Sequence, residues 1–211
     1  TITKEKLDVL KKHNVTRISI NPQTFSNKTL KLIGRAHTAQ NIIEAYKMAL
    51  PYGFSINMDL IAGLENESFQ TFKKSLLKTL ELSPNNITVK RTSKLSEGEG
   101  DVGAEDEVKK MIDFSYKTLT ENGYNPYYLY KQKNMVGNLE NIGYTKPNYE
   151  CVFNIDSMEE VATIVACGAN AISKRYFSLQ NRIERNANVK NLQDYISRID
   201  EIISKKQQFF K

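Results

Sequence analysis

The first 95 residues alternate between helical and extended patterns, and this alternation constrains the fold more than any other feature of the sequence. Apolar residues recur at helical spacing in four segments, 3–13, 27–33, 38–50 and 68–80. Between these segments lie three strand-like runs, 17–20, 55–61 and 86–91. Strands separated by helices in this way pair in parallel through right-handed crossovers. The pattern therefore predicts an α/β fold, either an α/β barrel or an open doubly wound sheet.

The character of the sequence changes at residues 96–103, an acidic and glycine-rich stretch that predicts a loop. Beyond it we expect a helix over 105–122, an aromatic strand over 124–130, hairpins and loops over 131–150, and helices over 159–166 and 190–206. We therefore divide the chain into a β/α region, residues 1–95, and an α+β accessory region, residues 96–211.

Composition argues against membrane and secreted proteins. No stretch of about 18 apolar residues is present, so no membrane span is expected. No basic-then-apolar leader marks a secretory signal. The two cysteines, Cys151 and Cys167, lack the spacing of a zinc or redox pair, and we expect both to be unreactive. A reducing, cytoplasmic location is the expectation that follows.

The net charge of +6 is spread along the chain, largely as lysine pairs on predicted helices. Such pairs usually lie on solvated helix faces. A basic surface also suits polyanions, including nucleic acid or a small molecule rich in carboxylates. No motif that combines basic and aromatic residues indicates specific nucleic-acid binding.

Polar residues fall at the predicted carboxyl ends of the strands, where parallel α/β sheets bind ligands. These residues are Gln23, Asp59 and the pair Lys90-Arg91. Asp59 shares a strand face with Asn57, opposite the apolar side chains, and should point into a lumen or cleft. A carboxylate there could accept both hydroxyls of a ribose. The alternative is an aspartate satisfied by backbone groups or by a lysine.

Gln23 and Arg35 each admit two interpretations. Gln23 offers an amide donor and acceptor, or is simply a turn residue after Pro22. Arg35 follows the glycine that ends a short predicted helix, and it either binds a carboxylate or lies solvated on the surface. The residues alone therefore indicate an α/β protein with a polar site at the strand ends.

Several runs of the sequence resemble the radical S-adenosylmethionine enzymes, in particular the oxygen-independent coproporphyrinogen III oxidases (dehydrogenases). RISINPQTF at 17–25 with LKLIGR at 30–35 is similar to the fourth β/α unit of that family, and INMDLIAGL at 56–64 is similar to its fifth strand. GYT at 143–145 and GANAIS at 168–173 resemble its C-terminal signatures. The stretch 128–149 resembles a clostridial and bacillus-like branch.

The resemblance implies cofactor-binding roles for five residues. Gln23 would lie near the ribose of S-adenosylmethionine, Arg35 would contact polar groups of that cofactor, and Asp59 would hold the ribose hydroxyls. Ile61 would lie near the adenine, and Ser93 is a weaker match to the adenine pocket.

The departures from the family are equally informative. The family holds a [4Fe-4S] cluster through a Cys-x3-Cys-x2-Cys motif, which this sequence lacks. In the family that motif lies upstream of the segment that this chain matches, and Cys151 and Cys167 have the wrong spacing for it. Glu65 stands where the family has a proline. We therefore expect the second half of a partial (β/α)6 barrel with an α+β C-terminal extension, without metal ligands or catalytic residues of its own and inactive alone.

The implied reaction is the oxidative decarboxylation of two propionates of coproporphyrinogen III in heme biosynthesis, with an electron donor that reduces the cluster. One alternative is a relative of the same fold that carries heme without oxidase activity. Alternatives of other classes are a basic nucleic-acid-binding module and an aldolase-type barrel, for which no Schiff-base lysine stands out. The open edge of half a barrel also leads us to expect dimerisation through that edge.

Overall fold

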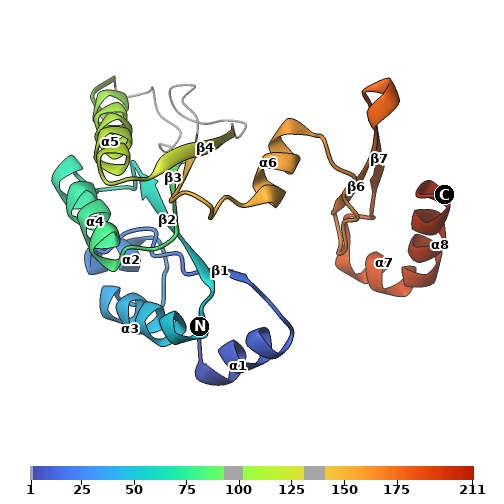
Figure 1. Ribbon diagram of the computed structural model, residues 1–211, viewed down its shortest axis with the longest axis horizontal. Coiled ribbons are helices and arrows are strands. Elements are labelled where there is room, and N and C mark those ends of the chain that lie inside the picture. Colours follow the sequence, from blue (N-terminus) through green and yellow to red (C-terminus); the bar gives the residue numbers. More distant parts are fainter. Residues whose placement is uncertain (1, 93–101, 131–140) are drawn as a thin grey trace. The chain divides into compact units, whose positions relative to one another are not determined.

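Three adjacent parallel strands form one side of the sheet in the first part of the chain (Figure 1). The computed structural model describes residues 2–92, 102–130 and 141–211. The strands β1 (Arg17–Ser19), β2 (Ser55–Ala62) and β3 (Asn86–Arg91) are adjacent in this order. Their register places Ser19 beside Asn57 and Asp59 beside Thr88. Because the strands are parallel, their carboxyl ends lie at the same end of the sheet, as the alternating pattern predicts.

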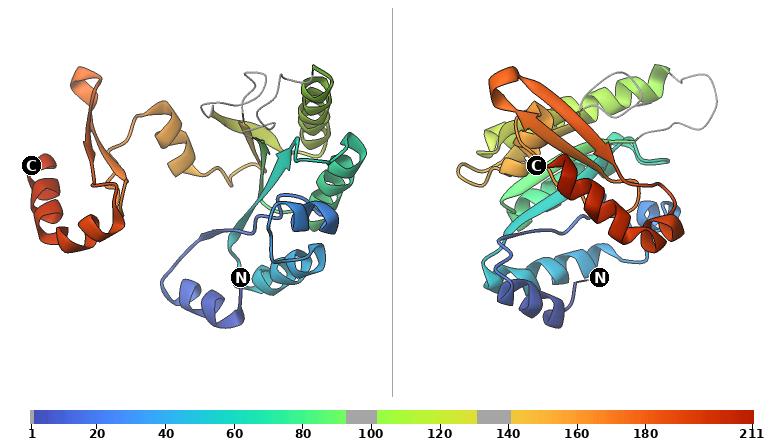
Figure 2. Two further views of the ribbon diagram at one scale, coloured as in Figure 1. Left: turned by 180° about the vertical axis from the view of Figure 1, so that it is seen from behind. Right: turned by 90° about the vertical axis from the view of Figure 1, so that its right-hand side faces the viewer.

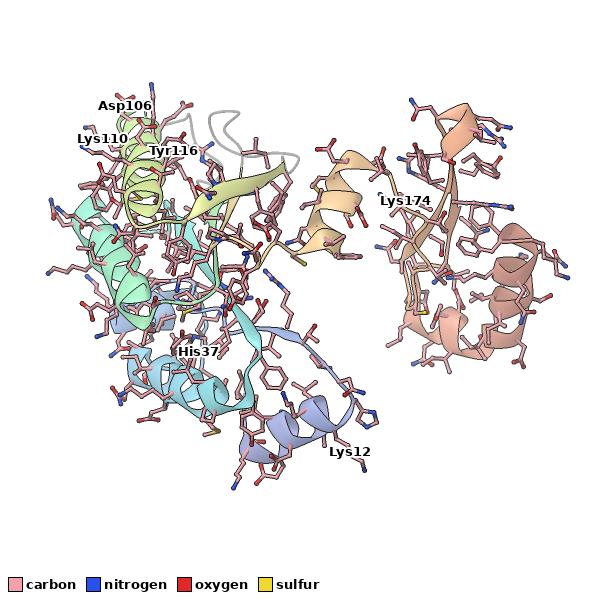
Figure 3. The ribbon with its side chains drawn as sticks, viewed as in Figure 1. Lys12, His37, Asp106, Lys110, Tyr116 and Lys174 are labelled. Atoms are coloured by element: carbon pink, nitrogen blue, oxygen red, sulfur yellow. The ribbon has the colours of Figure 1, made fainter. Side chains whose placement is uncertain are left out.

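Helices pack against one face of this sheet, as two views of the ribbon agree (Figures 1 and 2). They are α2 (Asn27–Leu32), α3 (Ala39–Ala49), the short η1 (Leu50–Tyr52), α4 (Phe69–Leu82) and α5 (Val102–Glu121), with α1 (Lys4–Lys12) preceding β1. Side-chain caps fix where two of them begin: Thr38 forms a capping box with Asn41, and Ser68 accepts from the N–H of Thr71. Asp106 and Lys110 project into solvent from α5 (Figure 3).

The buried core lies between the helices and the apolar face of the strands. Ile56, Met58 and Leu60 of β2 and Ile87 and Val89 of β3 are at most 1 % exposed. They alternate with the polar residues of the same strands because successive strand residues point to opposite faces. The helices contribute the rest of this core, including Leu30, Ile42, Tyr46, Phe72, Leu76, Met111 and Leu119. One face of the sheet is therefore covered, and the other carries the polar side chains.

Two antiparallel strands extend the sheet beyond β3. β5 (Asn141–Thr145) pairs with β3, and β4 (Asn125–Tyr130) pairs with β5, so the order is β1-β2-β3-β5-β4. The predicted architecture, a partial parallel barrel with an α+β extension, is confirmed. Residue 95 is close to where the sheet changes from parallel to antiparallel, but the first compact unit continues to Glu150. β1 forms the opposite edge, and among the described residues β2 is its one strand partner.

The second compact unit, residues 151–211, combines a hairpin with short helices. The hairpin strands are β6 (Ile172–Phe177) and β7 (Arg182–Ala187), joined through η3 (Ser178–Gln180); the helices are α6 (Val152–Glu159), α7 (Leu192–Ser197) and α8 (Ile199–Phe209). Lys174 on β6 donates to the carbonyl of Ser157 and pairs with Glu160, which ties α6 to the hairpin (Figure 3). Of the two cysteines, Cys151 is half-buried and Cys167 is exposed, and both are free thiols.

Two predicted helices of the second unit are wrong in their bounds. The helix expected over 159–166 lies earlier, because Glu160 has φ +55° and ends α6 there. Ile164 instead forms a β-bridge with Lys174. The helix expected over 190–206 is divided at Arg198, which has φ −110° and ψ 22°.

Among the described helices, none has both the length and the hydropathy that crossing a membrane requires.

Candidate functional site

A polar surface covers the face of the sheet opposite the helices. It arises from the register, which aligns Asn57 and Asp59 of β2 with Asn86 and Thr88 of β3. The antiparallel strands continue it, because Thr88 lies beside Gly143, and Gly143 beside Tyr128. We call the strand residues of this face the polar face: Ser19, Asn57, Asp59, Ile61, Asn86, Thr88, Lys90, Asn141, Gly143, Tyr128 and Tyr130.

Asp59 is the centre of a hydrogen-bonded cluster on the polar face. Its Oδ2 lies 2.6 Å from Nζ of Lys90, and its Oδ1 accepts from Nδ2 of Asn57 at 2.7 Å. Oδ1 of Asn57 in turn accepts from the hydroxyl of Thr88 at 3.1 Å, which fixes the orientation of its amide. The Asp59 side chain is 7 % exposed, whereas that of Lys90 is 35 % exposed. The cluster thus holds a nearly buried carboxylate in place and balances its charge with a lysine that reaches solvent.

The backbone of Gln23 extends the sheet beside Asp59. Its N–H donates to the carbonyl of Asp59, and its carbonyl accepts from the N–H of Ile61, both at 2.9 Å. Gln23 is buried and has φ +65°, a left-handed conformation that costs a non-glycine residue free energy. The structure therefore brings three of the residues implicated by the sequence, Gln23, Asp59 and Ile61, to the same strand ends.

Two aromatic rings lie on the polar face next to the Asp59 cluster. The rings of Tyr128 and Tyr130 stack with centroids 5.9 Å apart and planes 4° apart. Burial raises the pKa of Tyr128 to about 12, and the nearby Asp59 carboxylate acts in the same direction. Burial also raises the pKa of Tyr130, while Lys90 opposes that change. Both shifts favour the neutral phenol over the phenolate.

Gly143 is required beneath these rings. A Cβ atom at this position would lie 1.8 Å from Cε1 of Tyr128, far inside van der Waals contact. The Tyr128 ring therefore rests directly on the backbone of β5, and only glycine leaves room for it. The sequence signal for this arrangement was the alternation of Tyr128 and Tyr130, opposite Gly143 in the GYT run.

A further predicted site residue, Arg35, is not hydrogen-bonded to the described residues of the cluster. Arg35 is exposed in the turn after α2, where its N–H donates to the carbonyl of Leu30. Ser93 lies outside the described residues. The sequence places Lys90 at a strand end. Its pairing with Asp59 depends on the register of β2 and β3, which the sequence does not specify.

A second buried network lies directly behind Gln23. The hydroxyl of Thr24 donates to Oε1 of Glu67 at 2.5 Å, and it also lies 3.1 Å from the hydroxyl of Ser75. The same Thr24 oxygen accepts from the N–H of Ser26. Glu67 is 6 % exposed, and burial raises the pKa of its carboxyl, although the hydroxyls of Thr24 and Thr29 oppose the change. The network joins the loop after β1 to the loop after β2 and to α4, through Thr24, the residue that follows Gln23.

The raised pKa of Glu67 predicts how stability depends on pH. Between the ordinary carboxyl pKa and the raised folded value, the folded state binds more protons than the unfolded state, so stability falls as pH rises through this window. The Glu67→Gln variant keeps an oxygen for Thr24 and loses the titration. We expect the stability of the wild type relative to Glu67→Gln to decrease as pH increases above about 4.5. Urea unfolding at a series of pH values measures this difference, and parallel curves for the two proteins would contradict it.

The hydrogen-bond acceptors of the polar face match the hydroxyl groups of the ribose of S-adenosylmethionine. Each Asp59 oxygen already accepts one hydrogen bond, and a carboxylate oxygen has a second lone pair for a hydroxyl. The described residues contain no group of three histidine, cysteine or acidic side chains that could hold a metal ion. The Asp59 carboxylate thus has the free lone pairs that a diol would need, and no such group of metal-binding side chains occurs in the described parts of the chain.

Comparison with known proteins gives consistent matches. The model of the radical SAM superfamily matches residues 1–78. The oxygen-independent coproporphyrinogen-III oxidase-like protein HemZ of Bacillus subtilis is 42 % identical over 219 aligned residues, which cover 100 % of this chain and 44 % of HemZ. The heme chaperone HemW of Escherichia coli is 27 % identical over 177 residues, 81 % of this chain and 44 % of HemW.

A solved structure supports the fold. Coproporphyrinogen III oxidase HemN of Escherichia coli, described as a radical SAM enzyme, superimposes with a TM-score of 0.69. The alignment covers 95 % of this chain and 46 % of HemN at 19 % identity, so the likeness concerns the fold alone. The chain spans less than half the length of each of these relatives.

Proposed function

Because the chain belongs to the radical SAM superfamily, among its oxygen-independent coproporphyrinogen-III oxidase-like members, we propose that it supplies part of a cofactor site for S-adenosylmethionine. The observation that carries the proposal is the Asp59 carboxylate, held by Asn57 and Lys90 at the carboxyl end of β2. In enzymes of this kind the bound cofactor and a reduced [4Fe-4S] cluster supply radical chemistry, and the protein binds, orients and shields.

The described residues would act on the cofactor by position and charge. Asp59 would accept the ribose hydroxyls, with its orientation fixed by Asn57 and its charge balanced by Lys90. Gln23 would offer its amide to the same sugar, and Ile61 an apolar contact to the adenine. Arg35, exposed after α2, would bind a polar group of the cofactor. Ser93 is retained as a proposal from sequence alone.

The substrate that we propose for the whole protein is coproporphyrinogen III, two of whose propionates would be oxidatively decarboxylated. A net charge of +6 suits a substrate with four carboxylates. The cluster ligands would lie outside this chain, and an electron donor would reduce the cluster. We also propose a cytoplasmic location, no specific binding of nucleic acid, and pairing of two copies through the open edge of β1.

The proposal is tested with the full-length protein under anaerobic conditions. We expect conversion of coproporphyrinogen III to protoporphyrinogen IX, and we expect it to require S-adenosylmethionine. Chromatography of the oxidised porphyrins measures this conversion. The 211 residues alone should develop no cluster absorbance after reconstitution with iron and sulfide. Cluster absorbance in this chain would show that its own side chains bind the cluster.

A second candidate function is that of a heme carrier, favoured by the match to HemW, which is described as a heme chaperone. The same experiment separates the two. A full-length protein that binds heme stoichiometrically and leaves coproporphyrinogen III unchanged would be a heme carrier.

A further inference from the structure

A separate cavity of about 360 Å³ lies at the carboxyl ends of β2 and β3, on the helix side of the sheet. Arg91 lines it, whereas the preceding residue, Lys90, belongs to the polar face. Successive strand residues point to opposite faces, so this cavity is distinct from the Asp59 cluster. Its charged lining residues are Glu65, Glu67, Arg91 and Glu107.

Arg91 brings a guanidinium to this cavity that makes no hydrogen bond to the described residues. The residue is 4 % exposed, and Nε, Nη1 and Nη2 are all buried without a hydrogen-bond partner in the part of the chain that the structure describes. Its backbone is fixed, because its N–H donates to Oδ1 of Asn141 at 2.7 Å. Burial lowers the pKa of Arg91, and Glu105 opposes the change. A buried guanidinium with unmade hydrogen bonds is costly, and a planar fork of N–H groups matches a carboxylate.

Glu67 supplies an unused acceptor in the same cavity. Its Oε1 accepts from Thr24, whereas Oε2 is buried and has no partner within hydrogen-bond distance among the described residues, although the hydroxyl of Thr29 is close enough to lower the pKa of this carboxyl. Glu107 also faces the cavity, and its Oε1 accepts from the N–H of Phe69 at 2.9 Å. One guanidinium therefore stands among three carboxyl groups. A simple anion would be attracted by Arg91 and repelled by the others, and a simple cation would leave Arg91 unpaired.

We propose that this cavity binds a small zwitterion with a carboxylate and an ammonium group, the chemistry of a free α-amino acid. The carboxylate would satisfy the fork of Arg91, and the ammonium group would donate to Oε2 of Glu67. The volume is at the small end of the range for ligand pockets, which suits a single compact molecule. The inference stands on the cavity and its unpaired groups and does not depend on the proposed function.

Thermal shift and calorimetric titration of the chain test the proposal. The probes are the proteinogenic L-amino acids, with propionate and propylamine as molecules that carry only one of the two charges. We expect at least one amino acid to bind and both single-charge probes to fail. Arg91→Met and Glu67→Gln should each weaken that binding by about tenfold or more, as expected for a lost hydrogen bond to a charged group. Arg198→Met is the matched control, because Arg198 is exposed and pairs with Glu201.

The unliganded variants provide a second measurement. Since no described group pairs with the guanidinium, Arg91→Met should unfold at the same temperature as the wild type or higher. A marked decrease would mean that the guanidinium has a structural partner, and it would overturn the proposal. So would unchanged amino-acid binding in Arg91→Met, or binding of none of the amino acids. Arg91→Lys, which keeps the charge but loses the fork, should also lose binding.

Discussion

Replacing Gly143 with alanine is expected to destabilise the first unit by about 3 kcal/mol, the upper part of the range for overpacked sites. The added Cβ would stand 1.8 Å from Cε1 of the Tyr128 ring, which stacks on the ring of Tyr130. Either the ring leaves the polar face or β5 shifts away from β4. Urea unfolding measures the loss, and the near-ultraviolet circular dichroism of the stacked tyrosines reports the displacement of the ring.

A double-mutant cycle identifies the cause of this loss. Tyr128→Ala removes the ring that the new methyl group meets, so adding Gly143→Ala to it should cost no more than about 0.5 kcal/mol. If instead Gly143→Ala costs as much without the ring as with it, the glycine is needed for backbone reasons, and the steric account is incorrect.

Replacing Asp59 with alanine in the full-length protein is expected to weaken S-adenosylmethionine binding by at least about tenfold, because hydroxyl bonds to a charged acceptor would be lost. Nothing else in the cluster can substitute, since Asn57 is oriented by Thr88 and Lys90 is a donor only. The affinity of Asp59→Asn for S-adenosylmethionine should lie between those of the wild type and Asp59→Ala, because one acceptor oxygen remains. Calorimetric titration of the cofactor gives the affinities.

Asp113→Ala is the matched control for this measurement, since Asp113 is exposed on α5. Asp59→Ala itself should have only a small effect on folding, because the Lys90 side chain can reach solvent once Asp59 is removed. Equal affinities in wild type, Asp59→Ala and Asp113→Ala would remove Asp59 from the cofactor site.

The parallel half of the sheet could be predicted because each of its strands carries its own signal. Ile56, Met58 and Leu60 alternate with Asn57 and Asp59, which defines both a strand and its two faces. The alternation also led to both predicted roles of Asp59, a hydrogen-bond acceptor for a ligand and a partner of a lysine. Lys90 indeed pairs with Asp59, and this pair still leaves lone pairs on the carboxylate.

The antiparallel strand β5 could not be predicted in the same way. Its sequence, Asn-Ile-Gly-Tyr-Thr, contains asparagine and glycine, which are depleted in strands. Its extended conformation is stabilised by neighbours on both sides, through pairing with β3 and β4. The same holds for Glu67, since a glutamate in a loop gives no sign of burial until the loop after β1 packs against it.

The order of strands in the sheet has a consequence for how the chain folds during synthesis. β4 precedes β5 in the chain but touches β3 only through it, so the edge of β3 stays unpaired until residues 141–145 have left the ribosome. At ordinary rates of translation this interval lasts on the order of several seconds. An unpaired strand edge is a template for association with other chains. During this interval the edge of β3, in addition to that of β1, is therefore open to pairing with another chain.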